Sequence, residues 1–126
     1  MPCSLGTNAA NSVRKPKKTA NALLTETQIT KSIRDLLSVL RIPHWKTWGG
    51  FIGQRGIPDI IGVLPGSGRF LAIEVKRPGG KLSHEQLCFL QKYENAGAVC
   101  MVAYDQHMVL ARLQTVGYEP AKKVEL

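Results

Sequence analysis

A turn-forming segment from Pro65 to Gly68 separates two apolar runs, residues 59–64 and 69–76, and this arrangement restricts the possible folds more than any other feature. Proline and glycine clustered in this way favour a tight turn, and apolar runs of this length on both sides are typical of strands. We therefore predict an antiparallel hairpin. A chain of 126 residues has the length of one compact domain, so the hairpin is expected to belong to a single core.

Two helices are predicted from capping boxes, in which a serine or threonine and a glutamine three positions later bond each other's backbone. Thr25 and Gln28 form the first box, and Ser83 and Gln86 form the second. Gly97 follows the second apolar helical pattern and is typical of a left-handed helix end. The sequence therefore predicts helices on both sides of the hairpin.

The fold class is predicted to be α/β, with the element order αβββαβα. The expected elements are a helix at 26–40, strands at 44–48, 59–64 and 69–76, a helix at 83–95, a strand at 98–103 and a closing helix at 105–113.

Positive charge extends over the whole chain, with 17 Lys and Arg against 9 Asp and Glu and a net charge of +8. Residues 1–22 lack a hydrophobic period, so we expect a disordered basic tail before a folded domain at 23–126. A positive surface suits a polyanion such as nucleic acid, although charge that only keeps the protein soluble would have the same pattern. The charge alone therefore leaves both interpretations open.

Other features exclude several classes of protein. Cys3, Cys88 and Cys100 are odd in number and lack a CxxC spacing, which argues against structural zinc and for the reducing cytoplasm. No apolar run approaches the ~18 residues that a membrane span needs. We therefore expect neither a membrane partner nor a signal peptide.

Three residues around the hairpin form a candidate catalytic centre. Side chains alternate along a strand, so Glu74 and Lys76 share one face. If Leu64 pairs with Arg69 across the turn, counting back equally along both strands places Asp59 opposite Glu74. Two carboxylates about 5 Å apart repel by roughly 3 kcal/mol at an effective dielectric of 20, so a divalent cation such as Mg²⁺ is expected between them.

Lys76 lies one strand repeat beyond Glu74. There, an ammonium group could hold an attacking water, an amine could deprotonate it, or the charge could stabilise a phosphate in its transition state. This combination suits phosphodiester hydrolysis. The alternative is an exposed strand end with an ordinary Glu-Lys pair, which leaves the position of Asp59 unexplained.

Glu26 and Gln86 are further candidates, each with a structural alternative. Glu26 lies beside the core-facing stripe of the first helix and could reach the metal or its water shell, or it could interact only with the helix dipole. Gln86 could orient the nucleophile or the phosphate, or it could serve only in its capping box.

Basic and aromatic residues flank the candidate centre. As a group, Lys46, Arg55, Arg77 and Lys81 are predicted to contact DNA, although each alone could be a solvated charge. The three aromatic residues near the glycine-rich segment could stack on a base, but we favour packing in the core or in a dimer interface; they are Trp45, Trp48 and Phe51.

Three motifs together resemble a known family: Gly-x-Pro-Asp at 56–59, Glu-x-Lys at 74–76 and Leu-Ser-x-x-Gln at 82–86. In this order and spacing they are similar to the VRR-NUC family, the virus-type replication and repair nucleases of the PD-(D/E)xK superfamily. The resemblance covers roughly residues 26–113 and implies a restriction-endonuclease-like core, αβββαβ with a central mixed sheet flanked by helices, followed by a C-terminal helix.

The resemblance also implies cleavage of DNA that depends on Mg²⁺ or Mn²⁺. Small stand-alone members look like homodimers from bacteria or phages that act on branched DNA. By position, the resemblance implies a catalytic lysine at Lys76, an active-site glutamine at Gln86, and metal ligands at Glu26, Asp59, Glu74 and the Val75 carbonyl.

The leading hypothesis is a structure-selective, metal-dependent endonuclease that cuts branched DNA such as four-way junctions as a homodimer. We expect it to act in the cytoplasm of a bacterium or a phage-infected cell. The alternative is a non-catalytic DNA-binding module that keeps the nuclease fold. A restriction-type enzyme is a third option, but the chain offers little length for a base-reading element.

Overall fold

The structure of the protein is a computed structural model that describes residues 24–48 and 55–119. The tail predicted for residues 1–22 and the aromatic residue Phe51 lie outside these ranges. The elements in chain order are α1 (Glu26–Val39), β1 (His44–Lys46), β2 (Ile60–Val63), β3 (Phe70–Val75), α2 (His84–Asn95), β4 (Val99–Ala103) and α3 (Gln106–Thr115). This confirms the predicted order αβββαβα.

The four strands form one mixed sheet in the order β1-β2-β3-β4. Strand β2 pairs antiparallel with both β1 and β3, whereas β3 and β4 are parallel and are joined through α2. In the β2–β3 hairpin, Ile60 lies opposite Ile73 and Ile61 opposite Ala72. The predicted register of the hairpin is therefore confirmed.

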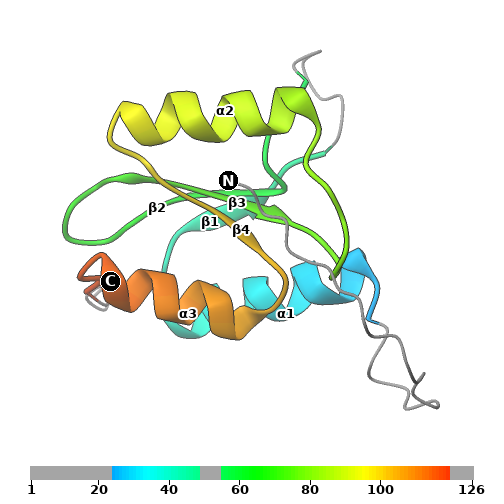
Figure 1. The fold of residues 1–126 in the computed structure, drawn as a ribbon. Coiled ribbons are helices and arrows are strands. Elements are labelled where there is room, and N and C mark those ends of the chain that lie inside the picture. The colour runs from blue at the N-terminus through cyan, green and yellow to red at the C-terminus, as the bar shows by residue number, and fades with distance from the viewer. Residues whose placement is uncertain (1–23, 49–54, 120–126) are drawn as a thin grey trace.

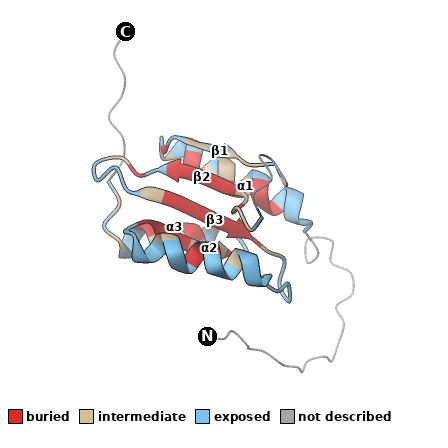
Figure 2. Ribbon diagram, turned by 90° about the horizontal axis from the view of Figure 1, so that it is seen from above, coloured by how far each residue is buried: buried red, intermediate tan, exposed pale blue. Residues whose placement is uncertain are grey.

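The sheet separates two apolar layers, with α2 on one face and α1 and α3 on the other (Figure 1). Leu71, Ile73 and Val75 of β3 belong to the larger cluster, with α1 and α3. Phe70 and Ala72 alternate with them and belong to the smaller cluster, with α2. Figure 2 shows β3 as the most continuously buried strand, because it has a paired strand on each side and helices on both faces.

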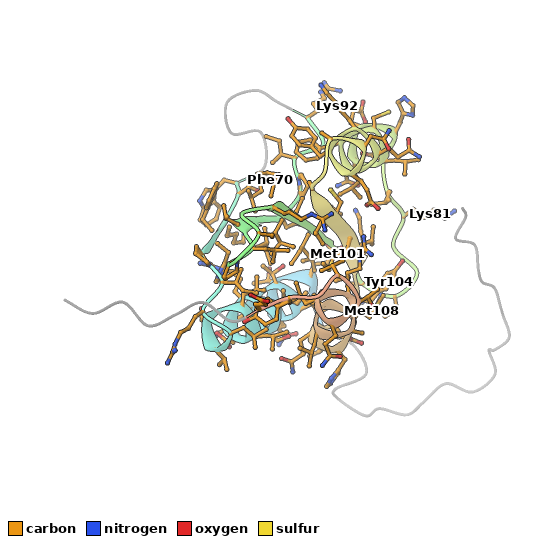
Figure 3. All side chains as sticks on the ribbon, turned by 90° about the vertical axis from the view of Figure 1, so that its left-hand side faces the viewer. Phe70, Lys81, Lys92, Met101, Tyr104 and Met108 are labelled. Atoms are coloured by element: carbon orange, nitrogen blue, oxygen red, sulfur yellow. The ribbon has the colours of Figure 1, made fainter. Side chains whose placement is uncertain are left out.

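The edge strand β4 also presents alternate side chains to the two layers. Met101 packs against the larger cluster, whereas Cys100 belongs to the smaller one. Figure 3 shows Phe70 on the side of the sheet nearer α2, and Met101 and Met108 on the side nearer α3. In the described ranges, no helix has the length and apolar character needed to cross a membrane.

Both predicted capping boxes are present. Thr25 accepts a hydrogen bond from the Gln28 N–H at 3.1 Å, and Ser83 accepts one from the Gln86 N–H at 3.1 Å. In each box the glutamine side chain bonds the backbone of the cap residue in return. These bonds satisfy N–H groups that a helix start leaves free, and so they fix where α1 and α2 begin.

All three helices end in a left-handed residue after the cap: Arg41 with φ of 60°, Gly97 with 112° and Gly117 with 78°. At the end of α1, the N–H of the next residue, Ile42, donates to the Leu37 carbonyl at 2.9 Å. This arrangement is the Schellman motif, in which glycine is strongly preferred because it has no Cβ to clash. The glycine stop predicted at Gly97 is confirmed, whereas α1 uses an arginine at the same position.

Arg41→Gly should stabilise the protein by about 0.5–1 kcal/mol, because it relieves the left-handed conformation that an L-residue adopts at a cost. Urea unfolding of the variant and the wild type measures this difference. Arg41→Ala is the matched control: it removes the same charge but keeps the Cβ, so it should change stability by less than about 0.5 kcal/mol. Equal stabilities for the glycine and alanine variants would show that the backbone at position 41 is not strained.

Candidate active site

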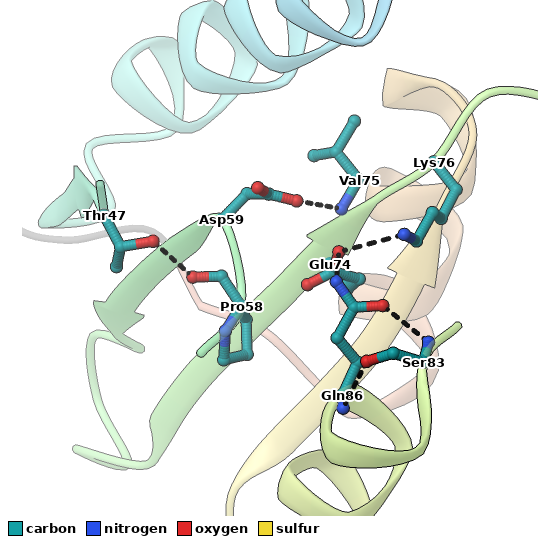
Figure 4. A network of polar contacts seen from close by, with 8 residues as sticks. All are labelled: Thr47, Pro58, Asp59, Glu74, Val75, Lys76, Ser83 and Gln86. Atoms are coloured by element: carbon teal, nitrogen blue, oxygen red, sulfur yellow. Dashed lines mark hydrogen bonds and ion pairs between the residues drawn. The ribbon is translucent and has the colours of Figure 1, made fainter. Parts of the chain in front are cut away.

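Four segments meet at the C-terminal end of β3 (Figure 4). Glu74 is the penultimate residue of β3, and Lys76 follows the strand directly. Asp59 comes just before β2, and Gln86 lies in the first turn of α2. The hairpin register and the crossover from β3 to α2 therefore bring together residues that are far apart in the sequence.

Asp59 is held by two backbone contacts. Its Oδ2 accepts a hydrogen bond from the Val75 N–H at 2.8 Å, and its carbonyl accepts one from the Thr47 N–H at 2.8 Å. The Thr47 hydroxyl donates to the Pro58 carbonyl at 2.6 Å. These bonds tie the segment before β2 to both neighbouring strands and orient the carboxylate toward the end of β3.

Glu74 is buried, with 3% of its surface exposed. Its Oε2 accepts a hydrogen bond from Gln86 Nε2 at 2.8 Å and lies 3.6 Å from Lys76 Nζ. Its Oε1 is also buried and has no hydrogen-bond partner among residues 24–48 and 55–119. An exposed strand end with an ordinary Glu-Lys pair is therefore the wrong interpretation of this segment.

The pKa of the Glu74 carboxyl is raised from its ordinary value of 4.5 to about 8. Burial is the main cause, and the negative charge of Asp59 raises the pKa further. Lys76 lowers the pKa, but it does not offset the other two effects. The folded protein therefore holds a carboxyl group that remains protonated at neutral pH unless a positive charge is added beside it.

Gln86 has the capping-box role and also contacts Glu74, whereas its role toward the nucleophile or the phosphate remains a prediction. Its Oε1 accepts from the Ser83 N–H at 2.8 Å, completing the capping box, while its Nε2 donates to Glu74 at 2.8 Å. The start of α2 and the position of the Glu74 carboxyl group therefore depend on one amide side chain.

Gly56 explains the first position of the Gly-x-Pro-Asp motif. Its φ is 80°, and a Cβ at this position would lie 2.5 Å from the Glu85 carbonyl oxygen in the first turn of α2. No side chain fits there without displacing backbone. Glycine therefore lets the segment that carries Asp59 approach the helix that carries Gln86.

Glu26 is exposed in the first turn of α1. In the part of the chain that the structure describes, no hydrogen bond or ion pair joins it to Asp59 or Glu74. Its predicted role at the metal remains a prediction.

The four candidate DNA-binding cations differ in how they are held. Lys46 is partly buried, with its Nζ 4.2 Å from the centre of the Trp48 ring. Arg55 has a side chain 85% exposed and lies 3.9 Å from the Glu85 carboxylate. Arg77 and Lys81 are exposed, and Figure 3 shows Lys81 pointing outward from the connection before α2. All four remain available for contact with a polyanion.

Trp45 in β1 and Trp48 just after it do not enter the core. Trp45 is 53% exposed and Trp48 is 67% exposed, so the prediction that these side chains pack in the core is wrong for both. Stacking on a base and burial in a dimer interface remain possible roles for these side chains.

The arrangement of oxygen atoms suits a divalent cation. The Lys76 N–H donates to the Ala103 carbonyl and so faces β4, whereas the Val75 N–H donates to Asp59 on the opposite edge of β3. The N–H and C=O groups of one strand residue point to the same edge. The Val75 carbonyl therefore also points toward the side on which Asp59 lies. Two carboxylates and one carbonyl are a ligand set that Mg²⁺ uses together with water. Within the described ranges, no group of three or more His, Cys, Asp or Glu side chains is placed to hold a metal.

Comparison with known families decides the identity of this fold. The VRR-NUC domain family matches residues 7–106. The chain belongs to the VRR-NUC family. The match includes part of the predicted tail and ends at the start of α3, so it begins and ends earlier than the expected resemblance over residues 26–113.

A solved structure described as a VRR_NUC domain has the same fold as this chain. It is 24% identical, with a TM-score of 0.61, and the alignment covers 74% of this chain and 97% of the other. A search of curated proteins finds no match. The VRR-NUC domain is thus a nuclease-type domain with a restriction-endonuclease-like α/β fold, as the sequence motifs predicted.

Sequence analysis did not identify Thr47 as part of the site. This residue holds the segment of Asp59 through its N–H and its hydroxyl, but no motif marks it in the sequence. Its role depends on the pairing of β1 with β2, which brings Lys46 opposite Ile60. In the sequence, only the extent of the predicted strand at 44–48, which includes Thr47, indicated that this residue lies beside the sheet.

The stability of the metal-free VRR-NUC domain should fall as pH rises from about 4.5 to about 8, because the folded state retains a proton on Glu74 that the unfolded chain has released. One such group contributes a slope of at most about 1.4 kcal/mol per pH unit. Glu74→Gln cannot ionise and should remove this part of the decline in urea unfolding measured with chelator.

The matched control is Glu94→Gln, which removes an exposed carboxyl group from α2 and should keep the decline. A Glu74→Gln variant that loses stability with pH as steeply as the wild type would show that another group titrates.

Proposed function

We propose that this VRR-NUC domain is an endonuclease that hydrolyses phosphodiester bonds of DNA with the help of a divalent cation. The observation that carries the proposal is the buried Glu74 carboxyl group next to Asp59, with one oxygen that has no partner in the described part of the chain. A fold gains nothing from burying one acid beside a second, partly buried acid, and such frustration is typical of functional sites. A cation and a phosphate would complete the polar contacts.

Asp59, Glu74 and the Val75 carbonyl would hold Mg²⁺ or Mn²⁺. When bound, the cation would supply Lewis-acid activation of the phosphate and neutralise charge in the transition state. It would also offset the effects of burial and of Asp59 that raise the Glu74 pKa, because a positive charge beside the carboxylate favours its ionised form. Glu26 would act from outside this set, on a water molecule of the ion's shell.

Lys76 is proposed as the catalytic residue. Its side chain is 15% exposed and its ammonium group lies 3.6 Å from Glu74 Oε2, so its position is restricted. From there it would orient the attacking water or stabilise the negative charge that grows on the phosphate oxygens. In the overall reaction the water oxygen bonds to phosphorus and one phosphorus–oxygen bond to the sugar breaks. Gln86 would keep the Glu74 carboxylate in place during these changes.

Lys76→Ala should reduce cleavage by at least about 100-fold while DNA binding changes little, because the lysine is assigned to the chemical step. The assay compares a labelled four-way junction, a flap and a plain duplex with Mg²⁺, with Mn²⁺ and with chelator. Asp59→Asn should also lose cleavage, and Lys92→Ala on the exposed surface of α2 should cut like the wild type. If the wild type binds every substrate tightly but cuts none, the protein is a non-catalytic DNA-binding module.

Branched DNA and a homodimer are the finer parts of the proposal. A two-fold assembly would present two sites to a junction of similar symmetry. The exposed side chain of Trp45, together with Val63 at 40% exposure, supports an apolar contact with another molecule.

Sedimentation velocity should therefore give twice the chain mass of 13.8 kDa at the concentrations at which junctions are cut. A monomer that cuts junctions at full rate would contradict the dimer but not the nuclease.

A further inference from the structure

A groove lined by polar and charged residues lies between α1 and β1, outside the carboxylate cluster. It has a volume of about 350 Å³. Residues of both elements line it, including Thr27, Thr30, Arg34, Ser38, His44 and Lys46. We call it the α1–β1 groove. Apart from Lys46, none of these residues takes part in the candidate active site.

The α1–β1 groove has an excess of positive charge. Lys31 and Asp35 also line it, but their side chains pair with each other at 2.9 Å and are 77% and 66% exposed. These two charges therefore offset each other at the solvent side. Arg34 and Lys46 remain as cations without a matching acid in the lining.

Arg34 has an unused donor inside the fold. Its Nε is buried and has no hydrogen-bond acceptor among the residues that the structure describes. A buried guanidinium N–H without a partner is unfavourable unless a water molecule or a ligand supplies the acceptor. Arginine presents several N–H groups in one plane, which matches the oxygen atoms of a phosphate.

The other side chains can complete such a site. His44 Nδ1 lies 2.9 Å from the Ile42 carbonyl oxygen, which can only accept, so Nδ1 carries the proton and is already engaged. Ser38 lies one helical turn after Arg34 in α1 and adds a hydroxyl group, which can donate to an anion. The groove therefore offers donors and positive charge, the chemistry that recognises phosphate.

The position of the α1–β1 groove connects it to the carboxylate cluster. Lys46 lies opposite Ile60, and the next residue, Thr47, donates its N–H to the Asp59 carbonyl at 2.8 Å. One end of the groove is thus one residue away from the contact that holds Asp59. A polyanionic chain with one phosphate at the carboxylate cluster can continue along this edge of the sheet.

We propose that the α1–β1 groove binds a second phosphate of the DNA strand, away from the bond that is cleaved, with Arg34 and Lys46 as its charged partners. This inference rests on the proposed nuclease function and names a part of the substrate beyond the reacting phosphate. The groove would hold the strand in register, so Arg34 is a positioning residue.

The test is DNA binding in chelator as a function of salt concentration, with an oligonucleotide duplex as the probe. Arg34→Gln should lower the slope of log affinity against log salt by about 1, because one phosphate contact is lost. Arg34→Lys should keep most of the slope, since the charge remains. The matched control is Lys92→Gln, which removes one charge from α2 on the other face of the sheet and should leave the slope unchanged (Figure 3).

Thermal unfolding of each variant identifies any loss of folding. If Arg34→Gln does not fold, Lys46→Gln tests the same groove and should also lower the slope. A slope equal to that of the wild type in a folded variant would overturn the proposal. Repeating the measurement with and without a 5′ phosphate on the DNA shows whether a terminal or an internal phosphate is bound.

The two proposals fail in different ways. If the wild type cuts no DNA with either metal, the nuclease proposal fails, while the salt slopes still report on the groove. The groove proposal fails, and the nuclease proposal stands, if two results are found together. Arg34→Gln cleaves DNA like the wild type at every salt concentration, and both proteins have the same slope of log affinity against log salt.

Discussion

The antiparallel pairing of β2 with β3 determines where the other parts of the site can lie. The pairing of Ile61 with Ala72 directs Leu71, Ile73 and Val75 into one apolar layer and Ala72 into the other. A shift by one residue would turn every one of these side chains to the wrong face, so the two cores on either side of the sheet enforce the register. The same register places the residue before β2 beside the end of β3.

The site at that position works against the stability of the fold. Glu74 is as buried as the apolar residues around it, and its protonated form is favoured by burial and by Asp59. The surrounding contacts hold the group without neutralising it: Gln86 donates one hydrogen bond, Lys76 lies 3.6 Å away, and one oxygen has no described partner. The cation proposed for this site would supply the missing interaction, and its binding would then be coupled to stability.

Backbone contacts around the carboxylates give the site its rigidity. The close approach of Gly56 to the first turn of α2 and the bonds from Thr47 join three elements at one place. Gln86 links the helix start to the carboxyl group in β3. Positions fixed by strands and a helix start are more exact than positions on loops, and the proposed hydrolysis of a phosphodiester would depend on such exact positions. The α1–β1 groove extends this polar edge toward α1.

Local chemistry in the sequence determined much of this protein. The turn at Pro65 to Gly68, the two capping boxes and the alternation of β3 predicted the element order, the hairpin register and the pair of Asp59 and Glu74. These signals are local or lie across one short turn, so neighbouring residues are enough to specify them.

Contacts between distant segments were decided only by the tertiary structure. The burial of Glu74 depends on α2, whose Gln86 reaches it from the far side of a crossover, and the exposure of Trp45 depends on which strand lies at the edge of the sheet. The unpartnered Nε of Arg34 arises where α1 meets β1. The burial and the hydrogen-bond partners of these particular side chains come from the packing of distant segments, and no local pattern encodes them.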